Sequence, residues 1–225
     1  MSQPMRVFLR VLAPLTAAGA AAIGLIWVAL RPWYTRWGAT NDELRRALPG
    51  DQLIARPHPL SVRTKAITIA APAARVWPWL VQLGQGRGGL YSYEWLENLL
   101  GMEMHNADRI RPEWQHIQVG DLVRMGPDGK APPPFVVALI DPGRVLVIGH
   151  RNQHDTGWHD TYTFVLEPID AHSTRLIHRS RAQALFSFDR ALEPGYFIME
   201  RGMLLGIKQR AERNQGTALL APGDA

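Results

Sequence analysis

The chain has 225 residues, a formal net charge of +5 and no cysteine. The lack of cysteine excludes disulfides, thiolate zinc sites, iron–sulfur ligation and cysteine nucleophiles, and it leaves the cellular compartment open. The arginines are scattered and form no basic run, so we expect no nucleic-acid binding despite the basic pI. The length and apolar fraction indicate one domain with appendages.

The N-terminal part carries an uncharged run of 20 residues, Val11–Leu30. At 1.5 Å per residue such a helix just spans a hydrocarbon core of about 30 Å. The far end of the run carries aromatic residues among arginines, as at a membrane interface, namely Trp27, Trp33, Tyr34 and Trp37. We expect residues 1–37 to anchor the protein by a single pass in the cell membrane. The count of cationic residues favours the main domain on the cytoplasmic side.

A cleaved signal peptide is the alternative for this segment. Arg6 and Arg10 resemble its charged region, and Ala18, Gly19 and Ala20 resemble its small-residue cleavage site. The apolar run continues for ten residues past Ala20, which favours an uncleaved anchor.

Residues 38–60 are expected to form a linker. Thr40 followed by Glu43 predicts a capping box and a short helix over Asn41–Leu48, with an extended connector after it. The main domain is then expected over residues 61–213, with a disordered tail over residues 214–225.

The first part of the main domain is predicted to be a strand over Lys65–Ala70, with Ile67 and Ile69 on one face and Lys65 and Thr68 on the other. A helix over Ala73–Leu83 should follow, kinked at Pro78.

Residues 77–101 combine aromatic side chains with glycine. They predict a helix that stops at Gly84, a mobile glycine loop over Gly84–Gly89, and a second helix that ends at Gly101. This composition is typical of the wall and gate of an apolar cavity. The expected ligand contacts in the segment are Trp79, Arg87, Tyr91 and Trp95.

Five strands in hairpin order are expected next, over Leu122–Met125, Phe135–Ile140, Val145–His150, Trp158–Leu166 and Thr174–Ala182. A long amphipathic helix should then run from Pro194 to about Arg213. One side of this helix is predicted to hold Met199, Met203, Gly206, Ile207 and Arg210, and Glu200 is predicted to lie off that side.

This order of elements, and the block Trp77–Asn98 followed by Asn106, Ala107 and Asp108, resembles the START-like or SRPBCC superfamily, which includes polyketide cyclases and lipid carriers. The chain is similar to a bacterial subgroup with an N-terminal membrane segment. The resemblance implies an α+β helix-grip fold, with a curved antiparallel sheet wrapped around a long C-terminal helix and one transmembrane helix before it. It implies a ligand cavity between sheet and helix.

Alternation along the last two strands nominates the lining of this cavity. Asp160, Tyr162 and Phe164 share one face, as do His178 and Ser180 on the next strand, and Met203 adds a contact from the last helix. The expected function is that of a membrane-anchored protein binding a hydrophobic small molecule of lipid, isoprenoid or polyketide type. The sequence assigns no oligomeric state.

An enzyme is the alternative function, of the cyclase, dehydratase or hydrolase type. Asp160 and His178 could act together as acid/base groups, since a carboxylate neighbour tunes an imidazole. His178 could equally bond Tyr162 or Ser180 within a satisfied core. No catalytic residue is assigned.

Neither a metal nor a cofactor is expected. Glu94 and Glu97, with His105, Asp108 and Glu113 beyond them, lack a known ligand motif, so a solvated helix face is the better interpretation. Glu94, Asn106 and Asp108 could instead brace the loop by hydrogen bonds. The glycine loop lacks the lysine and hydroxyl residue of a phosphate-binding loop.

Overall fold

The computed structural model describes residues 24–26, 28–54, 60–152, 157–183 and 187–218. They fall into two compact units, one ending at Thr35 and the other beginning at Arg36. Each unit is described by itself.

In the first unit, residues 24–26 and 28–34 are helical. Within the part of the chain that the structure describes, no helix is long and apolar enough to cross a membrane. Most of the predicted span, Val11–Leu30, lies outside the described residues.

The second unit is built on one antiparallel sheet of six strands in the order β1-β6-β5-β4-β3-β2. The strands are β1 (Leu60–Ile69), β2 (Leu122–Val123), β3 (Phe135–Asp141), β4 (Val145–Gly149), β5 (Asp160–Pro168) and β6 (Thr174–Gln183). Strands β2 to β6 were predicted within a few residues, because turn-forming residues separate them in the sequence, whereas β1 begins five residues before its predicted start at Lys65. At the turn between β3 and β4, the backbone N–H of Arg144 donates to the Asp141 carbonyl over 2.9 Å, and Gly143 has φ of +79°.

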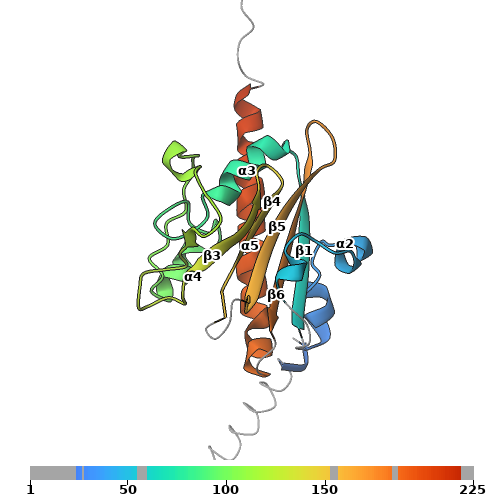
Figure 1. The fold of residues 1–225 in the computed structure, drawn as a ribbon. Helices are drawn as coiled ribbons and strands as arrows, with labels where there is room; N and C mark the ends of the chain where they lie inside the picture. The colour runs from blue at the N-terminus through green and yellow to red at the C-terminus, as the bar shows by residue number, and fades with distance from the viewer. Residues whose placement is uncertain (1–23, 27, 55–59, 153–156, 184–186, 219–225) are drawn as a thin grey trace, which may run out of the picture. The chain divides into compact units, whose positions relative to one another are not determined.

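The helices of this unit are α2 (Asn41–Arg45), α3 (Ala73–Val81), α4 (Glu94–Leu99) and α5 (Ser187–Ala218), with short 3₁₀ turns η1 (Asp51–Leu53) and η2 (Pro112–Trp114). Helix α5 crosses one face of the curved sheet and packs against β1 and α3 (Figure 1). This is the α+β helix-grip arrangement expected from the resemblance. Pro78 lies inside α3, as expected.

The face of the sheet toward α5, here called the inner face, carries the main core. Ile69, Leu176 and Leu166 of β1, β6 and β5 belong to the same buried cluster as Leu204 and Ile207 of α5. A second buried cluster, with Ala66, Ile177 and Val165, lies on the outer face. Both faces are therefore covered, and β4, β5 and β6 place alternate residues in the two clusters.

The predicted placement of Lys65 was wrong. Side chains alternate with a period of two, so Lys65 shares the inner face with Ile67 and Ile69, and it is fully buried. The placement of Glu200 on α5 was wrong as well. It is buried on the stripe that holds Phe197, Leu204 and Ile207, three or four residues apart along the helix. α5 also continues to Ala218, past its predicted end.

The glycine loop is held closed by hydrogen bonds between Gly84 and Gly89, each donating to the other's carbonyl over 2.9 Å. Gly84, Gly86 and Gly89 have positive φ. A side chain at Gly88 would collide with Gln82 and with the Tyr91 hydroxyl. Backbone conformation and close packing thus account for these glycines.

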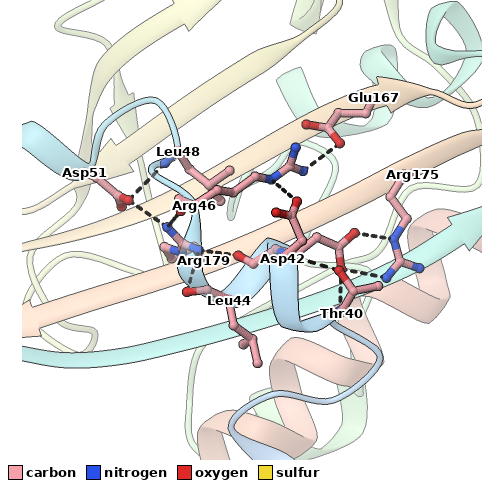
Figure 2. A network of polar contacts seen from close by, with 10 residues as sticks. Thr40, Asp42, Leu44, Arg46, Leu48, Asp51, Glu167, Arg175 and Arg179 are labelled. Atoms are coloured by element: carbon pink, nitrogen blue, oxygen red, sulfur yellow. Dashed lines mark hydrogen bonds and ion pairs between the residues drawn. The ribbon is translucent and has the colours of Figure 1, made fainter.

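Residues 40–54, here called the strap, lie on the outer face. The predicted capping box is confirmed, since Thr40 and Glu43 bond each other's backbone amides. Arg179 of β6 points outward and bonds the carbonyls of Glu43 and Arg46 and the carboxylate of Asp51 (Figure 2). These bonds fix the strap to the sheet.

Candidate functional site

The inner face changes from apolar to polar along its strands. Register places Ile67, Leu176 and Leu166 side by side in one row across β1, β6 and β5. The next row is Lys65, His178 and Phe164, and the one after it is Arg63, Ser180 and Tyr162. We call Arg63, Lys65, His178 and Ser180, with Glu193 and Glu200 of α5, the inner polar cluster.

A buried ion pair forms the centre of this cluster. The Lys65 ammonium of β1 contacts the Glu200 carboxylate of α5 directly. Burial lowers the pKa of Lys65, and Glu200 opposes this. Burial would also raise the pKa of Glu200, but the charge of Lys65, with His178 and Arg63 nearby, outweighs it and holds that pKa well below its usual range. Glu200 is therefore a carboxylate at neutral pH.

His178 is oriented by its neighbours on β5. Its Nδ1 lies 3.2 Å from the Thr163 carbonyl, and its ring stacks on Phe164 with the ring centres 4.6 Å apart. A carbonyl only accepts, so Nδ1 carries the hydrogen and Nε2 of the neutral ring is an acceptor. Nε2 lies 3.8 Å from a Glu200 oxygen, which is too far for a hydrogen bond.

Three buried polar atoms of the cluster have no hydrogen-bond partner among the described residues: His178 Nε2, Ser180 Oγ and Arg63 Nε. Leaving such a group unsatisfied costs about 1–3 kcal/mol. Arg63 and Ser180 are opposite each other in register, and His178 is two residues from Ser180 on the same face. The cluster thus offers an acceptor, a hydroxyl and a donor in adjacent positions.

Asp160 does not pair with His178. Its carboxylate accepts from the backbone N–H of His150 over 2.8 Å and lies 2.8 Å from Nδ1 of the same residue, while Nε2 of His150 is 2.9 Å from the Pro133 carbonyl. The predicted acid/base unit is therefore not formed. Burial would lower the pKa of His150, but Asp160 and the Pro133 carbonyl raise it above its ordinary value.

The aromatic block contributes to the core more than to a cavity wall. Trp79 and Tyr91 are buried and meet edge to face, with ring centres 5.6 Å apart. Tyr91 has φ of +58°, and its backbone lies so close to α5 that only glycine fits at Gly206. Burial raises the pKa of the Tyr91 hydroxyl.

Two predicted contacts of the block are placed differently. The Arg87 guanidinium donates to the carbonyls of Val81 and Trp114 over 3.0 and 2.6 Å, so it braces the loop. Trp95 is 69% exposed on α4 and does not face the inner core. Its role as a ligand contact stays a prediction.

The remaining predicted residues lie together. Tyr162, Phe164 and Met203 belong to the inner core, and the Tyr162 ring stacks near His178 with centres 6.1 Å apart. Burial, and then the charge of Asp160, raise the pKa of Tyr162. Tyr162 and Phe164 lie beside Ser180 and His178 in the sheet register, and Met203 is in the same core cluster as Phe164.

Within the described ranges, no group of three or more side chains that could hold a metal ion is found. The Glu94 carboxylate accepts from the backbone N–H of Asn106 over 3.0 Å, and the side-chain oxygen of Asn106 accepts from the backbone N–H of Tyr91. Glu94 and Asn106 thus brace the loop, as predicted. Asp108 is exposed. Glu97 is buried, contrary to the predicted solvated face, and burial together with Glu94 raises its pKa to about 7.

Two pockets stand out in the described part of the chain, and both lie away from the inner polar cluster. One has a volume of about 510 Å³ and lies between the strap and the outer face. The other, of about 240 Å³, is formed by residues 124–129 and 131–134 before β3. The space between the inner face and α5 is packed with core side chains.

Lys65, Arg63 and Glu200 were missed by the sequence analysis. Strict alternation from Ile69 through Ile67 would have placed Lys65 and Arg63 on the inner face. Helical spacing back from Ile207 and Leu204 would have placed Glu200 there. The charge of these residues argued against burial, although paired charges can be buried.

No family model and no curated relative matches the chain. Among solved structures it is similar to the self-sacrificing resistance protein CalC from Micromonospora echinospora, at 12% identity and a TM-score of 0.44 over 70% of this chain and 96% of that one. A norcoclaurine synthase from Thalictrum gives 12% identity and 0.37 over 73% and 99%. A polyketide-cyclase-like protein from Corynebacterium glutamicum gives 17% and 0.35 over 71% and 93%.

At these identities and TM-scores, the similarities give no information about the ligand or the activity of this chain. The assignment of the fold rests on the strand order and on the packing of α5 against the sheet.

The contact between His150 and Asp160 predicts a pH-dependent stability. The folded-state pKa of His150 is raised, so its charged ring stabilises the fold fully below the unfolded pKa near 6.5, and this stabilisation is lost as pH rises through the folded-state pKa. We expect His150→Gln to lower the free energy of unfolding by about 1–2 kcal/mol at about pH 5.5, and by less at about pH 8.5. Urea unfolding at both pH values measures this.

The exposed residue His116 provides the matched control, His116→Gln. A difference in the free energy of unfolding between wild type and His150→Gln that stays constant across the pH range would contradict the prediction.

Proposed function

We propose that the protein binds a small, mostly hydrophobic molecule between the inner face of the sheet and α5. The observation that supports this is the set of three unpartnered polar atoms, on His178, Ser180 and Arg63, at the border of an apolar core. Binding sites of this kind combine apolar walls with a few convergent polar groups. A polar group of the ligand would satisfy atoms that are otherwise costly to bury.

The charges of the cluster favour an uncharged ligand. Arg63 and Lys65 are balanced by Glu193 and Glu200, all four being buried. An added carboxylate would upset this balance in a region of low dielectric. A hydroxyl group fits better, because it can donate to His178 Nε2 and accept from Ser180 or Arg63.

Core side chains fill this space in the structure, so ligand binding requires some of them to move. Met203 lies in the inner core, three residues after Glu200 on α5, and an unbranched thioether side chain is the easiest to rearrange. The Asp160–His178 pair of the enzyme alternative is not formed, since Asp160 contacts His150 and not His178.

The proposal predicts selective binding of a phenol over the matched acid. With the full chain in an amphipol, we expect 4-nonylphenol to bind about tenfold or more tighter than 4-nonylbenzoic acid. His178→Leu should weaken phenol binding about tenfold, because the hydroxyl then loses its acceptor. Quenching of tryptophan fluorescence and native mass spectrometry measure both.

The exposed His172 supplies the control variant, His172→Leu, which should bind as wild type does. Failure of every probe to bind, or equal binding by wild type and His178→Leu, would overturn the proposal.

We propose further that the N-terminal run anchors the protein in the cell membrane with residues after Leu30 on the cytoplasmic side. The support is the length of the uncharged run, Val11–Leu30, and the aromatic residues among arginines that follow it.

The anchor predicts that the full chain sediments with membranes and resists alkaline extraction. The variant Ile23→Lys with Ile26→Lys should move to the soluble fraction, because each charge in the span costs about 3 kcal/mol. Ile169→Lys, at an exposed position of the second unit, is the control. A soluble wild type, or a mature N-terminus just after Ala20, would contradict the anchor.

A further inference from the structure

The pocket on the outer face is separated from the inner polar cluster by the sheet itself. The strap forms one wall through Leu44–Ala47, Asp51, Gln52 and Ile54, and the strands form the other through Val62, Arg179 and Arg181. Its volume of about 510 Å³ suits a small-molecule ligand.

Cationic side chains dominate the polar part of this pocket. Four arginines line it, Arg45, Arg46, Arg179 and Arg181, against one acidic residue, Asp51. Asp51 is shared by two of them, with Oδ2 at 2.6 Å from Arg179 and Oδ1 at 3.5 Å from Arg181. The lining residues therefore carry four positive charges and one negative charge.

Arg179 supplies this charge from a fixed position. Its Nε donates to Thr64, and its terminal nitrogens donate to Asp51 and to the carbonyls of Glu43, Leu44 and Arg46. All five of its N–H groups are therefore used, as Figure 2 shows in part. The Arg179 guanidinium therefore holds the strap and adds to the positive electrostatic potential of the pocket. It has no N–H group left to donate to a ligand.

Two other arginines can meet a ligand directly. Arg45 is exposed on α2 and makes no ion pair with a described residue. Arg46 bonds Glu167 over 2.7 Å through Nη2, and its Nε lies 3.6 Å from Asp42 in an ion pair but makes no hydrogen bond with a described residue (Figure 2). Guanidinium groups bind phosphate with charge-assisted hydrogen bonds.

The rest of the lining is apolar. Leu44, Ala47, Ile54 and Val62 face the same space, and Val62 is 45% exposed although it lies on a strand of the sheet. A ligand that fills the pocket therefore meets arginine on one part of its surface and hydrocarbon on another.

We propose that this outer pocket binds an anionic amphiphile, a phosphate headgroup joined to an apolar chain. The headgroup contacts Arg45 and Arg46 in the field of Arg179 and Arg181, and the first carbons of the chain lie on Leu44, Ile54 and Val62. A membrane phosphatidate and a soluble phosphorylated lipid share this chemistry. The site is independent of the proposed inner ligand.

Calorimetric titration of the full chain in an amphipol tests the site with three probes: dihexanoyl phosphatidic acid, dihexanoyl phosphatidylcholine and inorganic phosphate. We expect the phosphatidic acid to bind about tenfold or more tighter than either of the others. Its affinity should fall as salt is added. Equal affinities for the two lipids would overturn the proposal, and equal affinities for phosphatidic acid and inorganic phosphate would overturn the part assigned to the apolar lining.

Variants locate the site. Arg45→Glu should weaken binding of the phosphatidic acid about fivefold or more, since it reverses an exposed charge at the pocket. Arg144→Glu, a charge reversal at an exposed turn outside the pocket, should leave the affinity unchanged. Wild-type affinity in Arg45→Glu, or affinity lost equally in Arg45→Glu and Arg144→Glu, would overturn the assignment.

Discussion

The contact between Lys65 and Glu200 is the constraint on which the second unit depends. Both side chains are buried, and a buried charge is tolerated only when it is paired. Because Lys65 lies on β1 and Glu200 on α5, the pair fixes how the helix is rotated and where it sits along the sheet. Met203, Leu204 and Ile207 then face the inner core. His178 and Arg63 are thereby brought to the same carboxylate, at 3.8 and 4.0 Å.

The two faces of the sheet use alternate residues of β6 for different purposes. Outward, Arg175 and Arg179 bond Glu43 and Asp51 and hold the strap in place (Figure 2). Inward, His178 and Ser180 keep polar atoms without a described partner. The outer face thus carries more guanidinium groups than carboxylates around its pocket, whereas the inner face carries balanced charges and buried polar atoms that make no hydrogen bond with a described residue. This difference is why the ligand proposals for the two faces differ in charge.

Much of the fold could be predicted from the sequence, since turns and period-two alternation mark the strands and the capping box marks α2. The charged members of the core could not be placed as readily. The partner of Asp160 is set by the β4–β5 pairing, which brings His150 to it, and spacing alone does not give that pairing. Glu97 was misplaced because α4 exposes its aromatic residue, Trp95, and buries a carboxylate, the reverse of the usual amphipathic pattern.

A double-mutant cycle on the ion pair tests the central claim most directly. Urea unfolding would be measured for wild type, Lys65→Met, Glu200→Gln and the double variant. Each single change is predicted to cost about 3–5 kcal/mol because it strands a buried charge, and the double variant to cost far less than the sum, with a coupling above about 2 kcal/mol. Single effects that add to within about 0.5 kcal/mol would show that the pair does not seat α5 on the sheet.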